Sequence, residues 1–225
     1  MADPATDTLH AWPVRLAIFD FDGTLADTFP FFVAIFNELA LQHGFRTVQA
    51  EEIPALRLLT VREIMRHLDL PLWKLPVVTR AFLARMKAQT SGIHLFPGID
   101  AVLAELAASG TTIAIVSSNS ADNIRRVLGP GNCALVSQLE CGASVFGKAA
   151  RLKKVLKRSG VAAGAAIYVG DQSNDFEAAT AAGIAFGAVA WGYADPAALR
   201  RYAPAREFLH VAELSRLRSI DTFNH

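Results

Sequence analysis

The chain has 225 residues, of which 52% are apolar and 19% are charged, and its formal net charge is only +1. This length suits one domain, or a core domain with a small insert, and the apolar fraction is enough for a large buried core. A chain so near neutrality has no charge excess that would attract nucleic acid or an acidic membrane, so we expect neither as a partner.

Two further features bear on where the protein works. The two cysteines, Cys133 and Cys141, are not in a Cys-x-x-Cys arrangement. Their spacing leaves a disulfide open, but two thiols in such a chain are typical of a reducing cytosol. Residues 1–13 contain no apolar stretch of signal-peptide length, and the longest apolar run, 181–194, is too short to span a bilayer. We expect a cytoplasmic protein, either a monomer or a homodimer.

The first predicted element is a strand, followed by a long helical stretch. Residues 14–19 form a short, mostly apolar run, which suits a strand buried on both faces. From about residue 30 to 95 no such run appears, and apolar residues recur instead at helical spacing between prolines. These residues are Phe31, Phe32, Ile35, Phe36, Leu39 and Ala40, then Val61, Ile64, Met65 and Leu68, then Val78, Phe82, Leu83 and Met86. They predict an all-helical insert.

Beyond the insert, predicted strands and helices alternate. Apolar runs suggest strands at 112–116, 165–169 and 185–190, with a weaker candidate at 134–137. Helical patterns, each with glycine or proline just past its end, cover 99–108, 121–128, 148–159 and 174–182. The tail beyond residue 196 adds a helix, a short strand near 207–211 and a last helix. Strands alternating with helices predict an α/β fold with a Rossmann-like, doubly wound parallel sheet.

The expected domain organisation follows from these patterns. Residues 1–28 and 96–225 would form the α/β core, and residues 29–95 would form the helical insert. Because the insert leaves and re-enters the core, we expect hinges near residues 27–30 and 96–98.

Polar residues able to do chemistry follow three of the predicted strands. In an open parallel sheet, ligands bind at the carboxyl ends of the strands, so residues far apart in sequence would meet at one edge. They are Asp20 and Asp22 after the first strand, Ser117, Ser118 and Asn119 after the run at 112–116, and Asp171 and Asp175 after the run at 165–169.

The segment Asp20-Phe21-Asp22-Gly23-Thr24 combines two carboxylates with a glycine. Asp20 could attack phosphorus and form an acyl phosphate. Asp22 could protonate the leaving oxygen and then deprotonate a water molecule. Gly23 would let the backbone turn and come close to a bound anion. The alternative is a solvated turn, in which acidic residues and glycine are also common.

Asp171 and Asp175 are four residues apart, so a helix that begins here places them on one face. Mg²⁺ prefers hard oxygen ligands and keeps several waters, and carboxylates from two strand ends would suit it. The alternative is a helix cap formed by Asp171 or Ser173.

Two weaker signals complete the predicted site. Ser117 and Ser118 offer hydroxyl and N–H groups before a helix, which is an anion site or equally a helix cap at Ser118, Asn119 or Ser120. Lys148 follows a glycine at the start of a predicted helix and could reach the same edge, although a single lysine is usually solvated.

Together these motifs resemble the haloacid dehalogenase superfamily of phosphohydrolases, in its phosphoglycolate phosphatase-like branch. The resemblance covers residues 14 to about 214, with the motifs in the family's order, and the 190–193 run Ala-Trp-Gly-Tyr is similar to the family's segment there. The insert lies where this branch carries its cap, and we call residues 29–95 the cap from here on.

The resemblance implies a Mg²⁺-dependent phosphatase that acts on a small phosphorylated metabolite. Asp20 would be the nucleophile and Asp22 the general acid and base. Lys148 would neutralise charge on Asp20 and on the phosphate. The implied metal ligands are Asp20, Asp22, through its backbone carbonyl, Asp171 and Asp175. The implied phosphate-binding residues are Gly23, Thr24, Ser117, Ser118, Asn119 and Lys148.

Other activities of the same fold remain open. A sugar phosphomutase would use the same nucleophile, and a catalytically silent protein would bind a phosphate ester without turnover. A dehalogenase is disfavoured because Asp22 and Asp171 would then have no purpose. A phosphonate hydrolase would need a Schiff-base lysine from the cap, where Lys74 and Lys87 are not in settings that obviously lower a pKa.

Substrate choice is expected to come from the cap. Family members often have glycine where this chain has Arg57 and Leu58, and Arg57 could bind a substrate carboxylate or a second phosphate. The alternative is a surface arginine on a helix. We interpret Phe31, Phe32 and Phe36 as packing within the cap rather than as a substrate cage.

Overall fold

The computed structural model describes residues 14–88, 92–142, 144 and 147–218. Its centre is a six-stranded parallel sheet in the order β5-β4-β1-β6-β7-β8. The strands are β1 (Leu16–Phe19), β4 (Thr112–Ser117), β5 (Val136–Cys141), β6 (Ala166–Gly170), β7 (Ala185–Val189) and β8 (Arg206–Phe208). The predicted Rossmann-like fold is therefore confirmed.

The strand β1 lies inside the sheet and is buried on both faces, as its apolar run predicts. Successive side chains of a strand point to opposite faces. Ala17 and Phe19 accordingly join one apolar cluster, while Leu16 and Ile18 join another.

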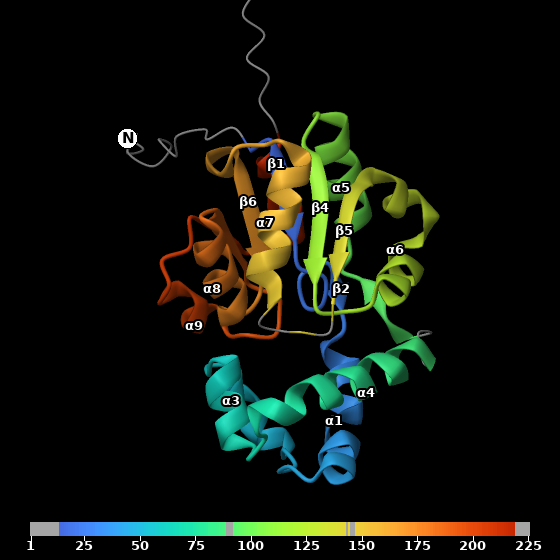
Figure 1. Ribbon diagram of the computed structural model, residues 1–225, viewed down its shortest axis with the longest axis vertical. Helices are drawn as coiled ribbons and strands as arrows, with labels where there is room; N and C mark the ends of the chain where they lie inside the picture. Colours follow the sequence, from blue (N-terminus) through green and yellow to red (C-terminus); the bar gives the residue numbers. More distant parts are fainter. Residues whose placement is uncertain (1–13, 89–91, 143, 145–146, 219–225) are drawn as a thin grey trace, which may run out of the picture.

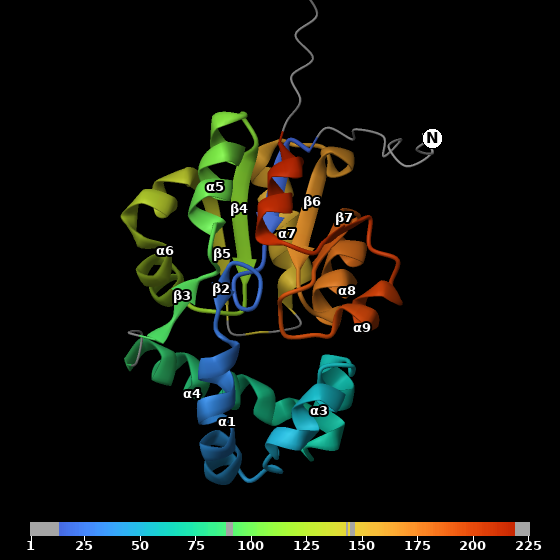
Figure 2. The same cartoon turned by 180° about the vertical axis from the view of Figure 1, so that it is seen from behind.

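Helices cover both of these faces. The helices α7 (Lys148–Ser159) and α8 (Ser173–Ala182) lie on the face seen in Figure 1. Figure 2 shows α5 (Ile99–Ala108) and the 3-10 helix η6 (Val211–Leu217) on the opposite face. The remaining core helices are α6 (Ala121–Leu135) and α9 (Pro196–Arg200). None of the helices described by the structure is both long and apolar enough to cross a bilayer.

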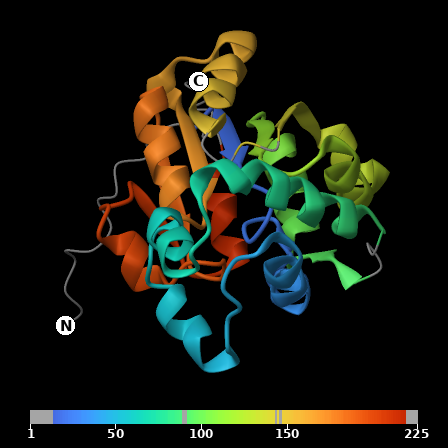
Figure 3. The same ribbon diagram turned by 60° about the horizontal axis from the view of Figure 1, so that its bottom comes forward.

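The cap is helical and lies beyond the carboxyl ends of the strands, where Figures 1 and 3 show its helices facing the sheet edge. The three predicted apolar stretches form α1 (Phe29–His43), α3 (Val61–His67) and α4 (Leu75–Ala88). Short elements link them: η1 (Ala50–Glu52), α2 (Ile53–Leu56) and η2 (Leu72–Lys74). The apolar stripes meet in a small core of their own, which includes Ile35, Leu39, Met65 and Leu68.

The chain passes between core and cap through two very short strands. These are β2 (Ala26–Asp27) and β3 (His94–Leu95), which pair antiparallel. The sequence analysis missed both, because two residues are too few to show an alternating pattern. The pair joins the two crossings of the chain directly beside the predicted hinge segments, 27–30 and 96–98. The proposed domain boundaries and hinges stay predictions.

The prediction that a helix ends at residue 128 agrees with a break at Gly129, whose φ is 72°. A second helical segment begins at Pro130, and the two together form α6 to Leu135. Two other expectations about local structure need correction. Because α6 occupies residues 134 and 135, the weak strand candidate at 134–137 is displaced and β5 begins only at Val136. The last predicted helix is the 3-10 helix η6.

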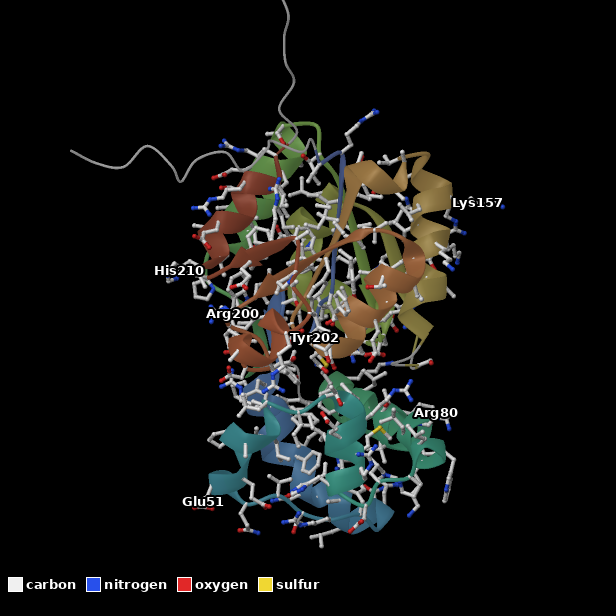
Figure 4. All side chains as sticks on the ribbon, turned by 90° about the vertical axis from the view of Figure 1, so that its left-hand side faces the viewer. Glu51, Arg80, Lys157, Arg200, Tyr202 and His210 are labelled. Atoms are coloured by element: carbon white, nitrogen blue, oxygen red, sulfur yellow. The ribbon has the colours of Figure 1, made fainter. Side chains whose placement is uncertain are left out.

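The remaining surface features agree with the sequence. Cys133 and Cys141 are both free and half-buried. Lys153, Lys154, Lys157 and Arg158 of α7 are exposed. Figure 4 shows Lys157 on the outside of the core, with Glu51 and Arg80 on the outside of the cap.

Candidate active site

Asp20 lies at the carboxyl end of β1 and is almost fully buried. The backbone N–H of Phe21 donates to its Oδ1 at 2.7 Å, and Lys148 Nζ donates to its Oδ2 at 2.6 Å. Burial raises the pKa of Asp20 to about 7, with Asp175 and Asp22 adding to this effect and Lys148 opposing it. The carboxylate is thus fixed in orientation at the predicted edge of the sheet.

A tight turn follows Asp20. The carbonyl of Phe21 accepts the N–H groups of Leu25 and Ala26 at 3.0 and 2.9 Å, which folds the chain back on itself. Gly23 has a φ of +76°, and a Cβ there would come within 2.3 Å of Asp171 Oδ2. Only glycine combines this conformation with this close approach, which accounts for the motif's glycine.

Asp22 is held by an asparagine from the next motif. Asn119 Nδ2 donates to both carboxylate oxygens of Asp22 at 3.0 Å. Asn119 is itself buried, and its N–H donates to Ser117 Oγ at 3.1 Å. Burial raises the pKa of Asp22, while hydrogen bonds from Asn119 and Thr28 oppose the rise. The structure therefore places the Asn119 amide on the candidate acid, although the sequence assigned it to phosphate.

Lys148 is buried, unlike the solvated lysine of the alternative interpretation. Its Nζ donates to Asp20 and to Asp175, both at 2.6 Å. Burial alone would lower the pKa of Lys148, but the charges of Asp175 and Asp20 outweigh it and raise this pKa above its usual value. The lysine is a permanent positive charge beside the candidate nucleophile.

Asp171 and Asp175 are both completely buried. Asp171 accepts the Tyr193 N–H at 2.7 Å on Oδ2 and the Thr24 hydroxyl at 3.2 Å on Oδ1. Asp175 Oδ2 accepts the N–H groups of Asp171 and Gln172. Gln172 is the N-cap of α8, so the alternative in which Asp171 or Ser173 caps this helix is wrong.

Glycines let other segments reach these aspartates. A Cβ on Gly192 would come within 2.1 Å of Asp171 Cβ, and one on Gly170 would come within 2.6 Å of Asp175. The backbone after β7 can pack directly on Asp171 only because position 192 has no side chain.

Three of the aspartates are arranged as a possible metal site. Single carboxylate oxygens of Asp20, Asp171 and Asp175 lie within 4.8 Å of one another, and all three residues are buried. Burial raises the pKa of Asp171 well above its usual value, and the neighbouring charges of Asp175 and Asp20 add to this rise. Such a group of hard oxygen donors, short of positive charge, fits a divalent cation such as Mg²⁺. The Asp22 side chain lies outside the triad, as expected of a residue that would offer its carbonyl.

The predicted phosphate-binding residues divide into two groups. Ser118 and Lys148 line a cavity of about 430 Å³ that also reaches Asp20 and Asp22. Thr24 and Ser117 are fully buried. The Thr24 hydroxyl donates to Asp171, and the Ser117 hydroxyl accepts the Asn119 N–H. Ser120, not Ser118 or Asn119, caps α6. The phosphate-binding roles stay predictions.

Tyr193 is a residue of the site that the sequence analysis gave no role. Its hydroxyl is 2.7 Å from Thr28 Oγ1, and its ring packs against Phe29 and Phe32 of the cap. Burial raises the pKa of Tyr193 well above its usual value. The only signal in the sequence was the 190–193 run, which the family resemblance singled out without assigning a function.

Arg57 joins the cap to the core. Its Nε donates to the Tyr193 carbonyl at 2.9 Å and its Nη2 to the Gly192 carbonyl at 3.0 Å. Its own carbonyl accepts the Asp195 N–H at 2.8 Å, and its guanidinium lies 5.7 Å from the Phe29 ring centre. Arg57 is half-buried in the cavity wall, and its predicted binding of a substrate anion stays a prediction.

The cap aromatic residues pack within the cap, as expected, and two of them also line the cavity. Phe31 packs edge-on against Phe82. Phe32 and Phe36 pack against each other and against Phe82 and Phe45, and both also line the cavity. Lys74, which a phosphonate hydrolase would need there, donates to the His43 carbonyl within the cap.

Known proteins resemble the chain over most of its length. Residues 17–189 match the family of haloacid dehalogenase-like hydrolases. A phosphoglycolate phosphatase of Synechococcus elongatus is 34% identical over 183 residues, which cover 81% of this chain and 86% of that protein. A phosphoglycolate phosphatase of Xanthomonas campestris is 28% identical over 192 residues, covering 80% and 84%.

Solved structures share the fold. A haloacid dehalogenase-like family hydrolase of Streptococcus pneumoniae has a TM-score of 0.72 at 21% identity, covering 89% of this chain and 96% of that one. CbbY of Rhodobacter sphaeroides, solved in complex with phosphate, has a TM-score of 0.63 at 24% identity, covering 87% and 93%. With its motifs gathered at one sheet edge beneath a helical cap, the chain belongs to the haloacid dehalogenase-like hydrolase family, in the phosphoglycolate phosphatase-like branch.

Proposed function

We propose that the protein is a Mg²⁺-dependent phosphatase that hydrolyses a small phosphate monoester through an aspartyl-phosphate on Asp20. The observation that carries this proposal is the position of Asp20, which is ion-paired to Lys148 at 2.6 Å and lies in the aspartate triad. The resemblance to phosphoglycolate phosphatases supports it.

In the first step, Asp20 attacks the phosphorus atom and the bond to the ester oxygen breaks. Asp22 lies two residues away and is aimed by Asn119, so it can donate a proton to the leaving oxygen. Lys148 offsets negative charge on Asp20 and on the phosphoryl group. The alcohol then departs with the proton from Asp22.

In the second step, water attacks the phosphorus atom of the aspartyl-phosphate. Asp22, now ionised, takes the proton from this water, and Asp20 is released as a carboxylate together with inorganic phosphate. Mg²⁺, held by Asp20, Asp171 and the Asp22 carbonyl, with Asp175 beside it, would supply charge stabilisation to the phosphoryl oxygens.

The first test measures hydrolysis of para-nitrophenyl phosphate with and without Mg²⁺ for the wild type and Asp20→Asn. We expect metal-dependent release of phosphate by the wild type and a loss of roughly 10³-fold or more in kcat for the variant. Acid quenching during turnover should leave a phosphoryl group on the peptide that contains Asp20. Asp100→Asn, on an exposed position of α5, is the control and should match the wild type.

Equal turnover by the wild type and Asp20→Asn would contradict the nucleophile assignment. Activity that appears only with a sugar bisphosphate would identify a phosphomutase. Ester binding without turnover would identify a silent binding protein.

A further inference from the structure

We propose that the preferred substrate is the phosphate ester of an apolar alcohol, aliphatic or aromatic, whose hydrocarbon body enters a cavity in the cap. The phosphate ester of a short acid such as glycolate would bind less tightly at this site. This inference rests on the proposed function, because it places the phosphate at Asp20.

The position of the cavity determines what occupies it. The cavity, of about 430 Å³, reaches from Asp20, Asp22 and Lys148 to Leu68 and Leu70 inside the cap. Figure 3 shows the cap helices covering the sheet edge where its floor lies. Because the candidate nucleophile lies at the floor, the group attached to a bound phosphate must extend into this space.

The walls of the cavity are hydrocarbon for most of their extent. Three cap helices supply many of the lining side chains, and the aromatic and aliphatic ones outnumber the neutral polar ones, which include Asn37, Thr79 and Asn174. The aromatic and aliphatic ones include Phe29, Phe32 and Phe36 from α1, Ile64 and Met65 from α3, and Val78 and Phe82 from α4. Such a surface favours an apolar ligand, since burial of hydrocarbon is favourable and roughly proportional to its area.

The charges available in the cavity argue against an acidic leaving group. Among the described residues that line it, the cationic side chains are Lys148 and Arg57. Lys148 is bound by Asp20 and Asp175, and Arg57 donates to two backbone carbonyls. A carboxylate on the leaving group would therefore be enclosed by a mostly apolar lining with neutral polar groups but no cation of its own, which is costly.

The size of the cavity supports the same conclusion. Small-molecule sites have volumes of about 300–1,000 Å³ and enclose most of the ligand surface. A two-carbon acid would leave much of this cavity unfilled, and a longer chain or a ring would occupy it.

The test uses phosphonates, which cannot be hydrolysed by this route, so that binding is measured separately from turnover. Calorimetry with Mg²⁺ gives the Kd of methyl-, butyl- and hexylphosphonate and of phosphonoacetate for the wild type. We expect Kd to fall by about fourfold for each added methylene until the cavity is full. Butylphosphonate should bind more tightly than phosphonoacetate.

Two adjacent valines of α4 provide a matched pair of variants. Val78 lines the cavity, whereas Val77 is 43% exposed and does not. Val78→Trp should fill the space and abolish the gain with chain length. Val77→Trp should behave like the wild type. The wild-type series decides the question even if Val78→Trp fails to fold.

The outcomes separate the two proposals. If Kd does not depend on chain length, or if phosphonoacetate binds most tightly, the inference is overturned while a measured phosphatase activity stands. If Kd falls with chain length but no ester is hydrolysed, the apolar site is supported and the phosphatase proposal fails.

Discussion

At the scale of single residues, Asn119 illustrates how a site residue can hold another residue instead of the ligand. Its amide donates to both oxygens of Asp22, and its N–H donates to Ser117. A carboxyl group that must give and then take a proton needs a fixed orientation toward the ester oxygen. We therefore propose that Asn119 positions the candidate acid and base.

We predict that Asn119→Ala lowers kcat by about 10- to 100-fold, because small misplacements of a reacting group cost rates of this order. KM should change by less than about twofold, since the phosphate still meets Lys148. Steady-state kinetics with para-nitrophenyl phosphate measures both constants. Asn132→Ala, on the same helix α6, is the control and should leave kcat unaltered. An unchanged kcat in Asn119→Ala would refute the role.

At the scale of elements, the cap and core meet through the end of α2 and the backbone that follows β7. Arg57 donates to the carbonyls of Gly192 and Tyr193, and the N–H of Tyr193 in turn donates to Asp171. The position of the cap is therefore connected through one segment to a candidate metal ligand. The planar guanidinium group can bind two carbonyls at once, which a lysine cannot do in the same geometry.

Arg57→Lys keeps the positive charge but cannot donate to the Gly192 and Tyr193 carbonyls at the same time. We predict that kcat/KM falls by about tenfold for every phosphate ester, whether or not it carries a carboxylate, because loosening the cap misplaces the whole leaving group. Comparison of butyl phosphate with phosphoglycolate measures this, and Arg80→Lys on the outside of the cap is the control. A loss confined to phosphoglycolate would show that Arg57 binds the substrate carboxylate instead.

At the scale of the whole molecule, the active site concentrates negative charge. Asp20, Asp22, Asp171 and Asp175 share a single lysine, and three of these carboxylates are almost fully buried. Buried like charges destabilise a fold unless a cation joins them. The folded protein without metal should therefore be less stable than its size would allow.

We predict that Mg²⁺ at about 100 times its Kd raises Tm by roughly 5–10 °C, the shift expected for a ligand that binds only the folded state of a chain of this size. Asp171→Asn should raise Tm in the absence of metal, because a neutral amide avoids the cost that burial imposes on ionisation of this carboxyl group, and should remove most of the Mg²⁺ effect. Thermal denaturation with Mg²⁺ or EDTA measures both. The same Mg²⁺ shift in Asp171→Asn as in Asp100→Asn would exclude Asp171 as a ligand.

The amino-acid sequence by itself determined the sheet and the set of residues at its edge. Buried strands are short apolar runs, and the carboxyl ends of parallel strands meet at one side, so local pattern was enough to bring Asp20 and Asp171 together. The helices of the cap followed from apolar spacing in the same way. These features depend on residues that are close in sequence, and the pattern therefore contains them.

Tertiary structure alone decided the partners of these residues. The sequence left Lys148 either as a site residue or as a solvated lysine, and only the fold brings it into contact with Asp20 and Asp175, which lie 128 and 27 residues away. The contact of Arg57 with Gly192 spans 135 residues, and the cavity arises where three helices leave space between them. No local sequence pattern predicts such contacts, because the free energy of a long-range contact depends on how whole elements pack rather than on the spacing of neighbouring residues.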